Sequence, residues 1–165
     1  MEATMMRLAV YNDVEHGQFL NTYALQDNSH TDTPQNIIEK SKKDQDRFPI
    51  VILDDADCQL IGCFCLHINR GPKEYGYEQK DAALIRGFSI DDNFKNQGYG
   101  SKALSDIFEF IDSTLKLDIN HVILAVNEKN IFAQKAYQKS GFWVVKRDIK
   151  GKKGKLLLME KSRKP

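Results

Sequence analysis

The sequence predicts a mixed α/β domain spanning residues 1–165, in which one mostly antiparallel sheet is covered by helices. Its length of 165 residues matches one domain, and a chain of this size buries roughly 70% of its unfolded surface. Hydrophobic residues make up 41% and charged residues 28%, as in an average soluble domain, which excludes a disordered chain or a small disulfide-stapled one. Apolar residues recur with strand spacing in some segments and with helical spacing in others, so both kinds of element are expected.

The first half of the chain predicts two helices between a first strand and a hairpin. Val14, Phe19 and Tyr23 mark one side of the first helix. Thr33 and Pro34 fit an N-cap followed by proline at the first helical position, which predicts the start of the second helix. The expected elements are a strand over 7–11, helices over about 13–25 and 34–43, and strands over 48–53 and 59–68 joined by a turn at 54–57.

The second half of the chain predicts helices that alternate with strands, followed by a hairpin. A turn-rich connection over 69–77 leads into it. Apolar residues such as Leu104, Ile107 and Ile111 recur at helical spacing, and Gly141 suits the end of a later helix. The expected elements are a strand over 82–90, a long helix over 99–117, a strand over 122–126, a helix over 130–140 and a hairpin over 142–161 that turns near 150–154.

Charge and hydropathy exclude several classes of partner. The chain has 24 basic and 23 acidic residues and a formal net charge of +1, which predicts no nucleic-acid partner and no membrane partner. The longest apolar runs fall far short of the roughly 20 residues that span a bilayer, and the N-terminus lacks a signal-peptide core, so we expect a cytoplasmic protein. A run of basic residues near the end of the chain is interpreted as a charged hairpin tip: Lys150, Lys152, Lys153 and Lys155.

The cysteines predict reduced thiols and no metal site. Cys58, Cys63 and Cys65 form an odd set, as is expected for a cytosolic protein. Cys63 and Cys65 would share one face of a strand, but no second pair of Cys or His residues has the spacing of metal ligands. We therefore expect no bound metal.

The most informative segment is a polar loop with two glycines, Gly98 and Gly100, between the strand over 82–90 and the long helix. Glycines let the backbone turn tightly and approach a ligand, and the first amides of a helix are unpaired at the positive end of its dipole. The loop is therefore a candidate phosphate site. It lacks the third glycine of a dinucleotide fingerprint, and the chain has no P-loop motif.

A second signature follows downstream, and the two together resemble the GNAT superfamily of acyl-CoA-dependent N-acetyltransferases. The family's phosphate loop reads Gln/Arg-x-x-Gly-x-Gly/Ala, and Lys95-Asn96-Gln97-Gly98-Tyr99-Gly100 matches it at both glycines. The family's downstream motif reads Asn-x-x-Ala-x-x-x-Tyr followed by Gly-Phe, and it is matched by Asn130, Ala133, Tyr137, Gly141 and Phe142. The resemblance is sharp over about residues 82–142. Lys95 stands where the family usually has Gln or Arg, which leaves the contacts of that side chain, and their effect on cofactor affinity, open.

The resemblance implies a sheet that is splayed between its fourth and fifth strands, with coenzyme A bound there as acetyl-CoA. The backbone amides of residues 97–102 would hold the pyrophosphate, and the strand ending at Ile90 would lie beside the pantetheine arm. Tyr137 would be the catalytic residue that donates a proton to the departing thiolate. The cofactor-binding residues implied in this way are Phe88, Ile90, Lys95, Asn96, Gln97, Gly98, Tyr99, Gly100, Ser101, Lys102 and Asn130.

Some roles stay open at this point. Tyr137 is alternatively a core aromatic residue, and Asn130 is alternatively, or also, a helix N-cap. The general base is unassigned, because a carboxylate in the connection before the central strand, a water held near Ser89, or no protein base at all would serve. The carboxylates in that connection are Glu74, Glu78 and Asp81.

The function that we expect is direct transfer of the acetyl group to a primary amine of a small molecule or to a protein N-terminus. The alternatives are a non-catalytic acyl-CoA-binding regulatory domain and a nucleotide-binding module, and a homodimer is possible on the family's pattern. Acidic and aromatic residues in two loops favour a cationic amine as the acceptor. The candidate acceptor residues are Asp27, Glu74, Tyr75, Tyr77 and Glu78.

Overall fold

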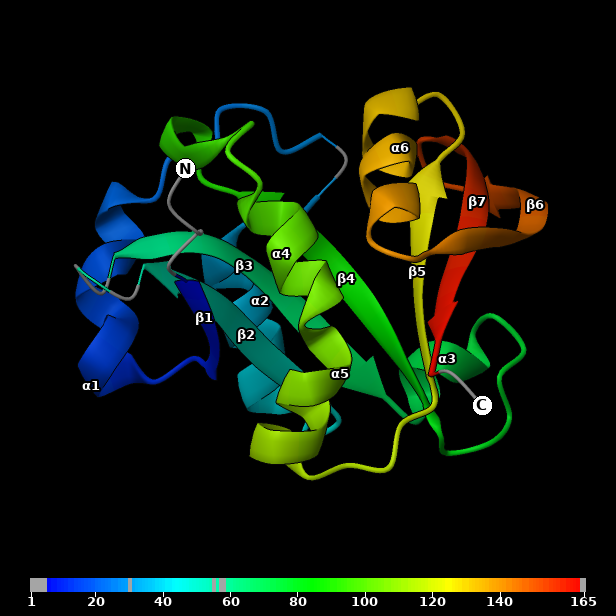
Figure 1. Cartoon of the computed structure of the whole chain (residues 1–165), viewed down its shortest axis with the longest axis horizontal. Helices are drawn as coiled ribbons and strands as arrows, with labels where there is room; N and C mark the ends of the chain where they lie inside the picture. Colours follow the sequence, from blue (N-terminus) through cyan, green and yellow to red (C-terminus); the bar gives the residue numbers. More distant parts are fainter. Residues whose placement is uncertain (1–5, 30, 55, 57–58, 164–165) are drawn as a thin grey trace.

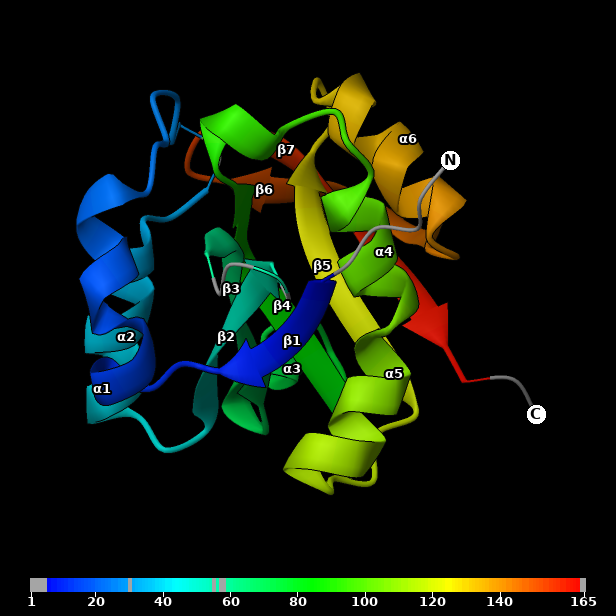
Figure 2. The ribbon, with the colours of Figure 1, turned by 60° about the vertical axis from the view of Figure 1, so that its left-hand side comes forward.

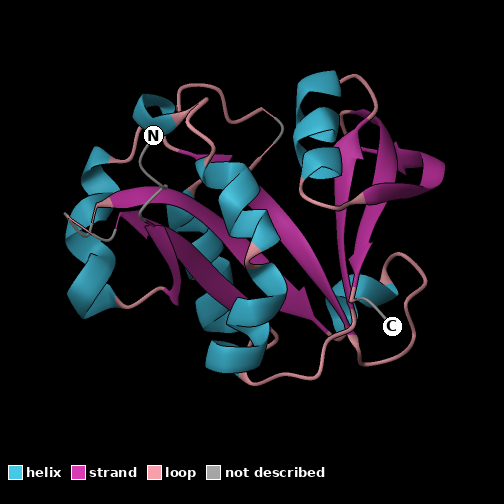
Figure 3. Ribbon diagram, viewed as in Figure 1, coloured by secondary structure: helices cyan, strands magenta, loops and turns pink. Residues whose placement is uncertain are grey.

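The computed structural model describes residues 6–29, 31–54, 56 and 59–163, and its centre is one seven-stranded sheet with the order β1-β2-β3-β4-β5-β7-β6 (Figures 1 and 3). All neighbouring strands are antiparallel except β4 and β5, which are parallel. The strands are β1 (Met6–Val10), β2 (Arg47–Asp54), β3 (Leu60–Ile68), β4 (Ala82–Ile90), β5 (His121–Asn127), β6 (Trp143–Gly151) and β7 (Gly154–Ser162). The predicted mixed, mostly antiparallel α/β fold is confirmed.

Helices cover both faces of the sheet, as Figure 2 shows, with α1 and α2 on one side of β1–β4 and with α4 and α5 on the other. The main apolar core lies under α4 and α5, where side chains such as Ile107 and Ile111 are fully buried. A smaller core under α2 contains Ile37, Val51 and Cys63. The helices are α1 (Asp13–His16), α2 (Pro34–Lys43), α3 (Arg70–Lys73), α4 (Tyr99–Ser105), α5 (Ile107–Phe110) and α6 (Ile131–Lys139), with 3₁₀ turns at Gly17–Thr22 and Asp92–Phe94 and a π-helical turn at Ile111–Leu115.

The parallel pair β4 and β5 opens toward its carboxyl ends. The two strands pair only from Ala82–His121 to Ile85–Leu124, so the last five residues of β4 have no partner in β5. Figure 1 shows the two strands together at their lower ends and apart at their upper ends, where α4 and α6 flank the opening. The predicted splay between the fourth and fifth strands is therefore confirmed, and it creates the space that the site occupies.

A bulge in β4 lies at the start of this opening. Cys63 pairs with Ser89 and Cys65 pairs with Arg86, so two residues of β4 lie opposite the single Phe64. Gly87 takes a φ of +64°, and a Cβ atom there would lie 2.9 Å from Cβ of Asp32. The position therefore requires glycine for two reasons, its backbone conformation and the close approach of the segment before α2.

The first predicted helix is much shorter than expected, while the second is as predicted. Only Asp13–His16 is α-helical, and the chain continues as a 3₁₀ turn from Gly17, a residue with low helix propensity. Val14, which was expected on the same side of the helix as Tyr23, is 90% exposed, whereas Tyr23 packs on the smaller core. At α2 the side chain of Thr33 accepts a hydrogen bond from the amide of Asn36, as an N-cap does.

Two further elements differ from the sequence-based expectation. The long helix predicted over 99–117 is interrupted at Asp106 and ends in the π-helical turn, in two stretches rich in Ser and Asp that have low helix propensity. The predicted turn-rich connection contains α3, because Pro72 is tolerated in the first turn of a helix. The predicted turn at 54–57 lies partly outside the described residues. No helix in the described part of the chain is long and apolar enough to cross a membrane.

Candidate active site

A cavity of about 730 Å³ fills the opening between β4 and β5, and we call it the splay cavity. One wall is the end of β4 with Phe88 and Ile90, and another is the end of β5 with Ala125 and Val126. The remaining walls come from the loop before α4, from α4, from α6 and from the loop over 25–31. Such a cleft at the carboxyl ends of diverging strands is the usual place for a ligand in an open α/β sheet.

The loop before α4 presents backbone amides to the splay cavity. Gly98 has a φ of +86° and precedes α4 without any side-chain cap, and Asn96 also adopts the left-handed conformation, with a φ of +63°. The first backbone hydrogen bond of the helix runs from the amide of Lys102 to the carbonyl of Gly98. The amides that precede Lys102 therefore have no partner inside the helix. A Cβ atom on Gly100 would point toward Phe88 and Ile90, at 3.5 and 3.6 Å. This geometry fits the phosphates of coenzyme A, because it combines free N–H groups with the positive end of a helix dipole.

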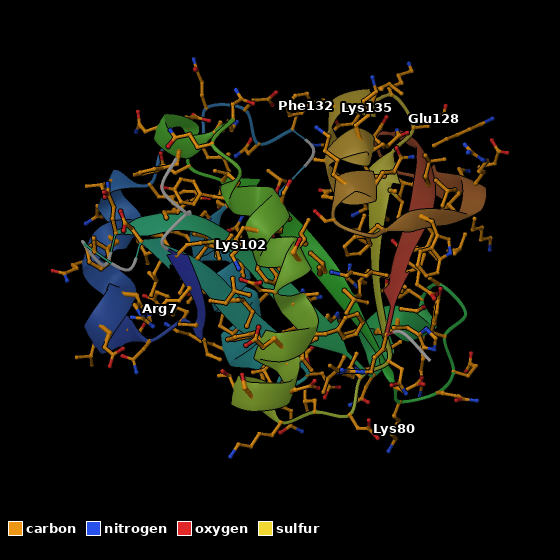
Figure 4. All side chains as sticks on the ribbon, in the orientation of Figure 1. Arg7, Lys80, Lys102, Glu128, Phe132 and Lys135 are labelled. Carbon is orange, nitrogen blue, oxygen red and sulfur yellow. The ribbon has the colours of Figure 1, made fainter. Side chains whose placement is uncertain are left out.

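Three lysines supply positive charge to the splay cavity. Lys95 lies in the loop and forms an ion pair of 2.9 Å with Asp92. Lys135 and Lys139 come from α6, and Figure 4 shows Lys135 and Phe132 at the upper end of that helix. The carboxylate that lines the cavity is Asp27, so cations outnumber carboxylates there. The charge therefore matches a phosphorylated ligand.

Tyr137 lies on the opposite wall from the glycine loop and contacts β4 across the opening. Its ring packs edge-on against Phe88, with 6.5 Å between the ring centres, and at a tilt against Phe142, with 6.1 Å between the ring centres. The backbone around it is fixed by the helix end, because the amide of Phe142 donates to the carbonyl of Tyr137 and Gly141 takes a φ of +98°. Burial raises the pKa of Tyr137 to about 12, so its hydroxyl stays protonated at neutral pH. No described residue forms a hydrogen bond with this hydroxyl, which leaves it available to a ligand.

Asn130 has a structural role that is compatible with ligand binding. Its side-chain oxygen accepts the amide of Ala133 at 3.2 Å and so caps α6, as the alternative interpretation of this residue proposed. Its side-chain NH₂ group is not used by that cap, and the residue lines the splay cavity. Asn127, which the sequence analysis did not single out, also lines the cavity and accepts the amide of Lys129.

Most of the sequence-predicted site residues line the splay cavity. They are Asp27, Phe88, Ile90, Lys95, Asn96, Gly98, Tyr99, Gly100, Ser101, Asn130 and Tyr137. Gln97 and Lys102 do not line it with their side chains: the Gln97 amide donates weakly to the carbonyl of Asn93, and Lys102 pairs with Asp106 at 2.7 Å. The contribution expected of Gln97 rests on its backbone amide, whereas the backbone amide of Lys102 already donates to the carbonyl of Gly98.

The acceptor candidates in the connection before β4 lie away from the cavity. Tyr75 and Tyr77 pack on Leu84, Ile123 and Leu158, and the Tyr77 hydroxyl donates to Glu160. Glu74 forms an ion pair of 2.7 Å with Arg86, and Glu78 is exposed. Burial of apolar ring surface on the sheet accounts for the position of the two tyrosines. The candidate bases Glu74, Glu78 and Asp81 are likewise absent from the cavity lining, whereas Ser89 lines it and bonds to Tyr23 at 2.8 Å.

The sequence analysis missed several residues of the cavity wall. Ser29 and Thr31 line it, and the Thr31 hydroxyl donates to the carbonyl of Phe88 at 3.0 Å. No local sequence signal marks these two residues, because only the tertiary fold brings them to β4. Lys135 and Lys139 carry a weak signal, since they lie one helical turn apart and follow Asn130. His30, in the same loop as Ser29 and Thr31, lies outside the described residues.

The two cysteines in the described part of the chain contribute no reactive group to this site. Cys63 and Cys65 are buried, and burial raises the pKa of Cys63 to about 12 and that of Cys65 to about 11. Neither residue lines the splay cavity. Cys58 lies outside the described residues. Within the described ranges no group of three or more Cys, His, Asp or Glu side chains is arranged to hold a metal ion.

Comparison with known proteins supports the class that the fold and the cavity define. The family model described as acetyltransferase (GNAT) family matches residues 13–142. An uncharacterized N-acetyltransferase, YbbJ of Bacillus subtilis (strain 168), is 31% identical over 130 residues, which cover 78% of this chain and 79% of that protein. The chain therefore belongs to the GNAT acetyltransferase family and is an N-acetyltransferase, as the sequence resemblance predicted.

Solved structures share the fold at low sequence identity. A spermidine N-acetyltransferase SpeG chimera from Vibrio cholerae and hSSAT has a TM-score of 0.68 and 16% identity, covering 96% of this chain and 95% of that chain. The Vibrio cholerae spermidine N-acetyltransferase in complex with CoA and spermine has a TM-score of 0.63 and 17% identity over 96% and 95% of the two chains. A GNAT-family acetyltransferase from Streptococcus pneumoniae has a TM-score of 0.64 and 16% identity, over 95% and 98%. At these identities the likeness establishes the fold alone.

Proposed function

We propose that the protein transfers the acetyl group of acetyl-CoA directly to a primary amine, carried by a small molecule or by a protein N-terminus. The single observation that carries this proposal is the splay cavity itself. An uncapped helix start faces it from one side, and the protonated, unpartnered hydroxyl of Tyr137 faces it from the other. A phosphate-binding end and a proton-donating group in one cavity are what acetyl transfer from coenzyme A requires.

The residues of the glycine loop bind and orient the cosubstrate. The amides of residues 97–101 hold its phosphates, with Lys95, Lys135 and Lys139 adding positive charge. Acetyl-CoA supplies an activated acetyl thioester when it is bound. The end of β4 from Arg86 to Ile90, which does not pair with β5, offers backbone groups to a ligand that lies along it as an added strand would, although the Phe88 carbonyl already accepts the Thr31 hydroxyl.

Tyr137 assists the departure of the thiolate. The amine nitrogen forms the new C–N bond with the acetyl carbon, the C–S bond breaks, and the nitrogen loses one proton while the sulfur gains one. A phenol with a pKa of about 12 is a weak acid, so its main contribution is a hydrogen bond to the developing negative charge on sulfur. The proton that the sulfur finally holds is balanced by the one that the nitrogen gives up.

Release of free coenzyme A thiol in the presence of an amine tests this function. Calorimetry with acetyl-CoA and, separately, with ATP measures the binding step first, and we expect binding of acetyl-CoA only. A thiol-specific dye then follows turnover with a panel of primary amines. Binding of acetyl-CoA without turnover of any amine would favour the regulatory, non-catalytic alternative, and the absence of binding would contradict the proposal as a whole.

A further inference from the structure

A second cavity, of about 580 Å³, adjoins the splay cavity and has a different character. It lies between the start of α2, the first residue of β2, the bulge of β4 and the tip of the β6–β7 hairpin. We call it the basic cavity, because five of its lining side chains are cationic and one is a carboxylate: Lys40, Arg47, Arg86, Lys152 and Lys153, with Asp32.

The two cavities meet at the point where the sheet opens. Ser29 and Thr31 line both of them. Arg86, which lines the basic cavity, is the first residue of β4 beyond the last pair with β5, and Phe88, which lines the splay cavity, follows two residues later. The two cavities are therefore adjacent, and Phe88, which contacts Tyr137, lies close to the residues that border both of them.

Positive charge remains in the basic cavity after every internal ion pair is counted. Asp32 pairs with Lys40 at 2.9 Å, Asp44 with Arg47 at 3.3 Å and Glu74 with Arg86 at 2.7 Å. Cations still outnumber these carboxylates by five to three. In the described part of the chain neither Lys152 nor Lys153 has an ion-pair partner, and Lys153 donates to the backbone carbonyl of Ser29.

Arg86 is held in a fixed orientation that leaves donors for a ligand. Its Nε donates to Nδ1 of the buried His67 at 3.0 Å, and one terminal nitrogen donates to Glu74. Burial, together with Arg86 and Arg47, holds the pKa of His67 below its ordinary value, so the imidazole stays neutral and can accept this bond. A guanidinium has five N–H donors, and these two contacts use two of them. The rest suit a carboxylate or a phosphate, which bind arginine with two parallel hydrogen bonds.

From this cavity we infer that the acceptor is a primary amine that also carries an anionic group, a carboxylate or a phosphate, with the anionic group bound by Arg86, Lys152 and Lys153. The inference rests on the proposed function and specifies its acceptor. It differs from the sequence-based expectation of a cationic amine, which depended mostly on residues of the connection before β4 that line neither cavity; the exception is Asp27, which lines the splay cavity. A polyamine in the basic cavity would meet a surplus of like charge.

Pairs of amines that differ only in the anionic group test the inference. The pairs are alanine with alaninamide and phosphoethanolamine with ethanolamine, and spermidine is the cationic comparison. We expect kcat/KM to be at least about tenfold higher for the anionic member of one or both pairs, since charge-assisted hydrogen bonds are worth about that factor. A carboxylate raises the pKa of the neighbouring amine and lowers its neutral fraction, so a preference for alanine would appear against that bias. The two pairs distinguish a carboxylate from a phosphate.

A double substitution at the hairpin tip shows whether the basic cavity causes the preference. Lys152→Gln with Lys153→Gln removes two charges from the cavity, and we expect the preference to fall about tenfold through KM, with kcat nearly unchanged. Lys150→Gln with Lys155→Gln is the matched control, because these lysines lie on the same hairpin but do not line the cavity. Added salt should weaken the preference of the unmodified protein.

Several outcomes would overturn the inference while leaving acetyl transfer intact. One is a kcat/KM for spermidine that exceeds that of both anionic amines. Another is a kcat/KM for alaninamide and for ethanolamine that equals or exceeds that of the anionic member in both pairs. The others are an unchanged preference in the Lys152 and Lys153 variant, or an equal loss of the preference in the control variant. Turnover of neither anionic amine by a protein that binds acetyl-CoA also overturns it. Failure to bind acetyl-CoA and to acetylate any amine is a different result, and it contradicts the proposed function.

Discussion

The two adjoining cavities of this protein are built in opposite ways. Much of the splay cavity comes from short continuous segments, such as the loop before α4 and the start of α6, and it presents backbone amides, glycines and the Tyr137 hydroxyl, with three lysines among its lining residues. The basic cavity takes single side chains from α2, β2, β4 and the β6–β7 hairpin, and it presents mainly long charged groups. Binding by backbone amides depends on the local conformation of the chain, whereas binding by distant side chains depends on the whole fold and on charge.

The two cavities are therefore expected to differ in how strongly side-chain substitutions affect ligand binding. Side chains can be exchanged in the glycine loop with little effect on backbone donors, unless they fill the space or disturb the left-handed conformation. In the basic cavity, by contrast, a single substitution of a lining residue removes one of the binding charges. The splay cavity is therefore expected to serve the common cosubstrate, and the basic cavity to decide between acceptors.

The largest effect is expected from Tyr137, the residue that we propose assists thiolate departure in the splay cavity. Tyr137→Phe keeps the ring contacts with Phe88 and Phe142 but removes the hydroxyl, so kcat should fall by about 10²–10⁴-fold with little change in acetyl-CoA affinity. Because the pKa of Tyr137 is about 12, loss of its proton should not lower kcat of the unmodified protein between pH 7 and 10. Tyr11→Phe, outside both cavities, is the control. An unchanged kcat, with chemistry as the slow step, would make Tyr137 a packing residue.

The next largest effect is expected from substitutions of Gly100, which test whether the glycine loop binds the cosubstrate through its backbone. In Gly100→Val the added carbons project toward Phe88 and Ile90, into the space that the cosubstrate must fill, so acetyl-CoA affinity should fall by roughly 10²-fold. Gly100→Ala should lose much less, because a single Cβ makes only ordinary contacts, at 3.5 Å. Calorimetry measures both affinities, and the unfolding temperature confirms that the variants fold. Equal affinity in all three proteins would place the cosubstrate elsewhere.

A substitution at the boundary between the cavities tests whether they share one rigid wall. Gly87→Ala places a Cβ 2.9 Å from Cβ of Asp32 at a φ of +64°, and the free energy of unfolding should drop by about 1–3 kcal/mol. The KM of the acceptor should rise more than that of acetyl-CoA, since Gly87 lines only the basic cavity. Gly76→Ala, also at a positive φ but with open space around it, controls for backbone strain. A greater rise in the acetyl-CoA KM would contradict the division of roles.

The smallest effect concerns the histidine beneath the basic cavity. Burial holds the pKa of His67, and that of His16, below the ordinary value of 6.5. The unfolded chain then binds more protons than the folded one, so the free energy of unfolding should decrease as the pH falls below about 6.5, by an amount on the order of 1 kcal/mol. The lowered pKa of Asp32 and Asp44 adds a further decrease only under more acidic conditions. Urea denaturation at pH 7.5 and 5.5 measures the change, and equal stabilities would contradict it.

The sequence predicted those parts of the fold and site that depend on neighbouring residues. Thr33 as an N-cap, the strand over 82–90 and the glycine loop each follow from local chemistry, and the structure has them where they were expected. The predicted length of the first helix was wrong. The prediction rested on apolar spacing, took no account of Gly17 and placed Val14 on the same side as Tyr23. Propensity and a few apolar positions do not decide a helix of this length when tertiary contacts favour a 3₁₀ turn.

The basic cavity was beyond sequence reasoning for a physical reason. Arg47 and Arg86 are neighbours only because β3 pairs with both β2 and β4 in one register, and the hairpin lysines reach the loop over 25–31 only in the finished fold. One signal was present: Arg86 interrupts an apolar strand and is followed by glycine, as is typical of a bulge. A charged residue there has to be paired or to serve a ligand.

The order of strands in the sheet also bears on how the chain acquires its fold during synthesis. β7 is made after β6 but lies between β5 and β6, and within the described sheet β6 pairs only with β7. Until β7 emerges, β5 is an edge strand with a row of unpaired amides and carbonyls, and such an edge invites pairing with other chains. The nascent protein is thus most exposed to aggregation in the interval between the synthesis of β5 and the arrival of β7.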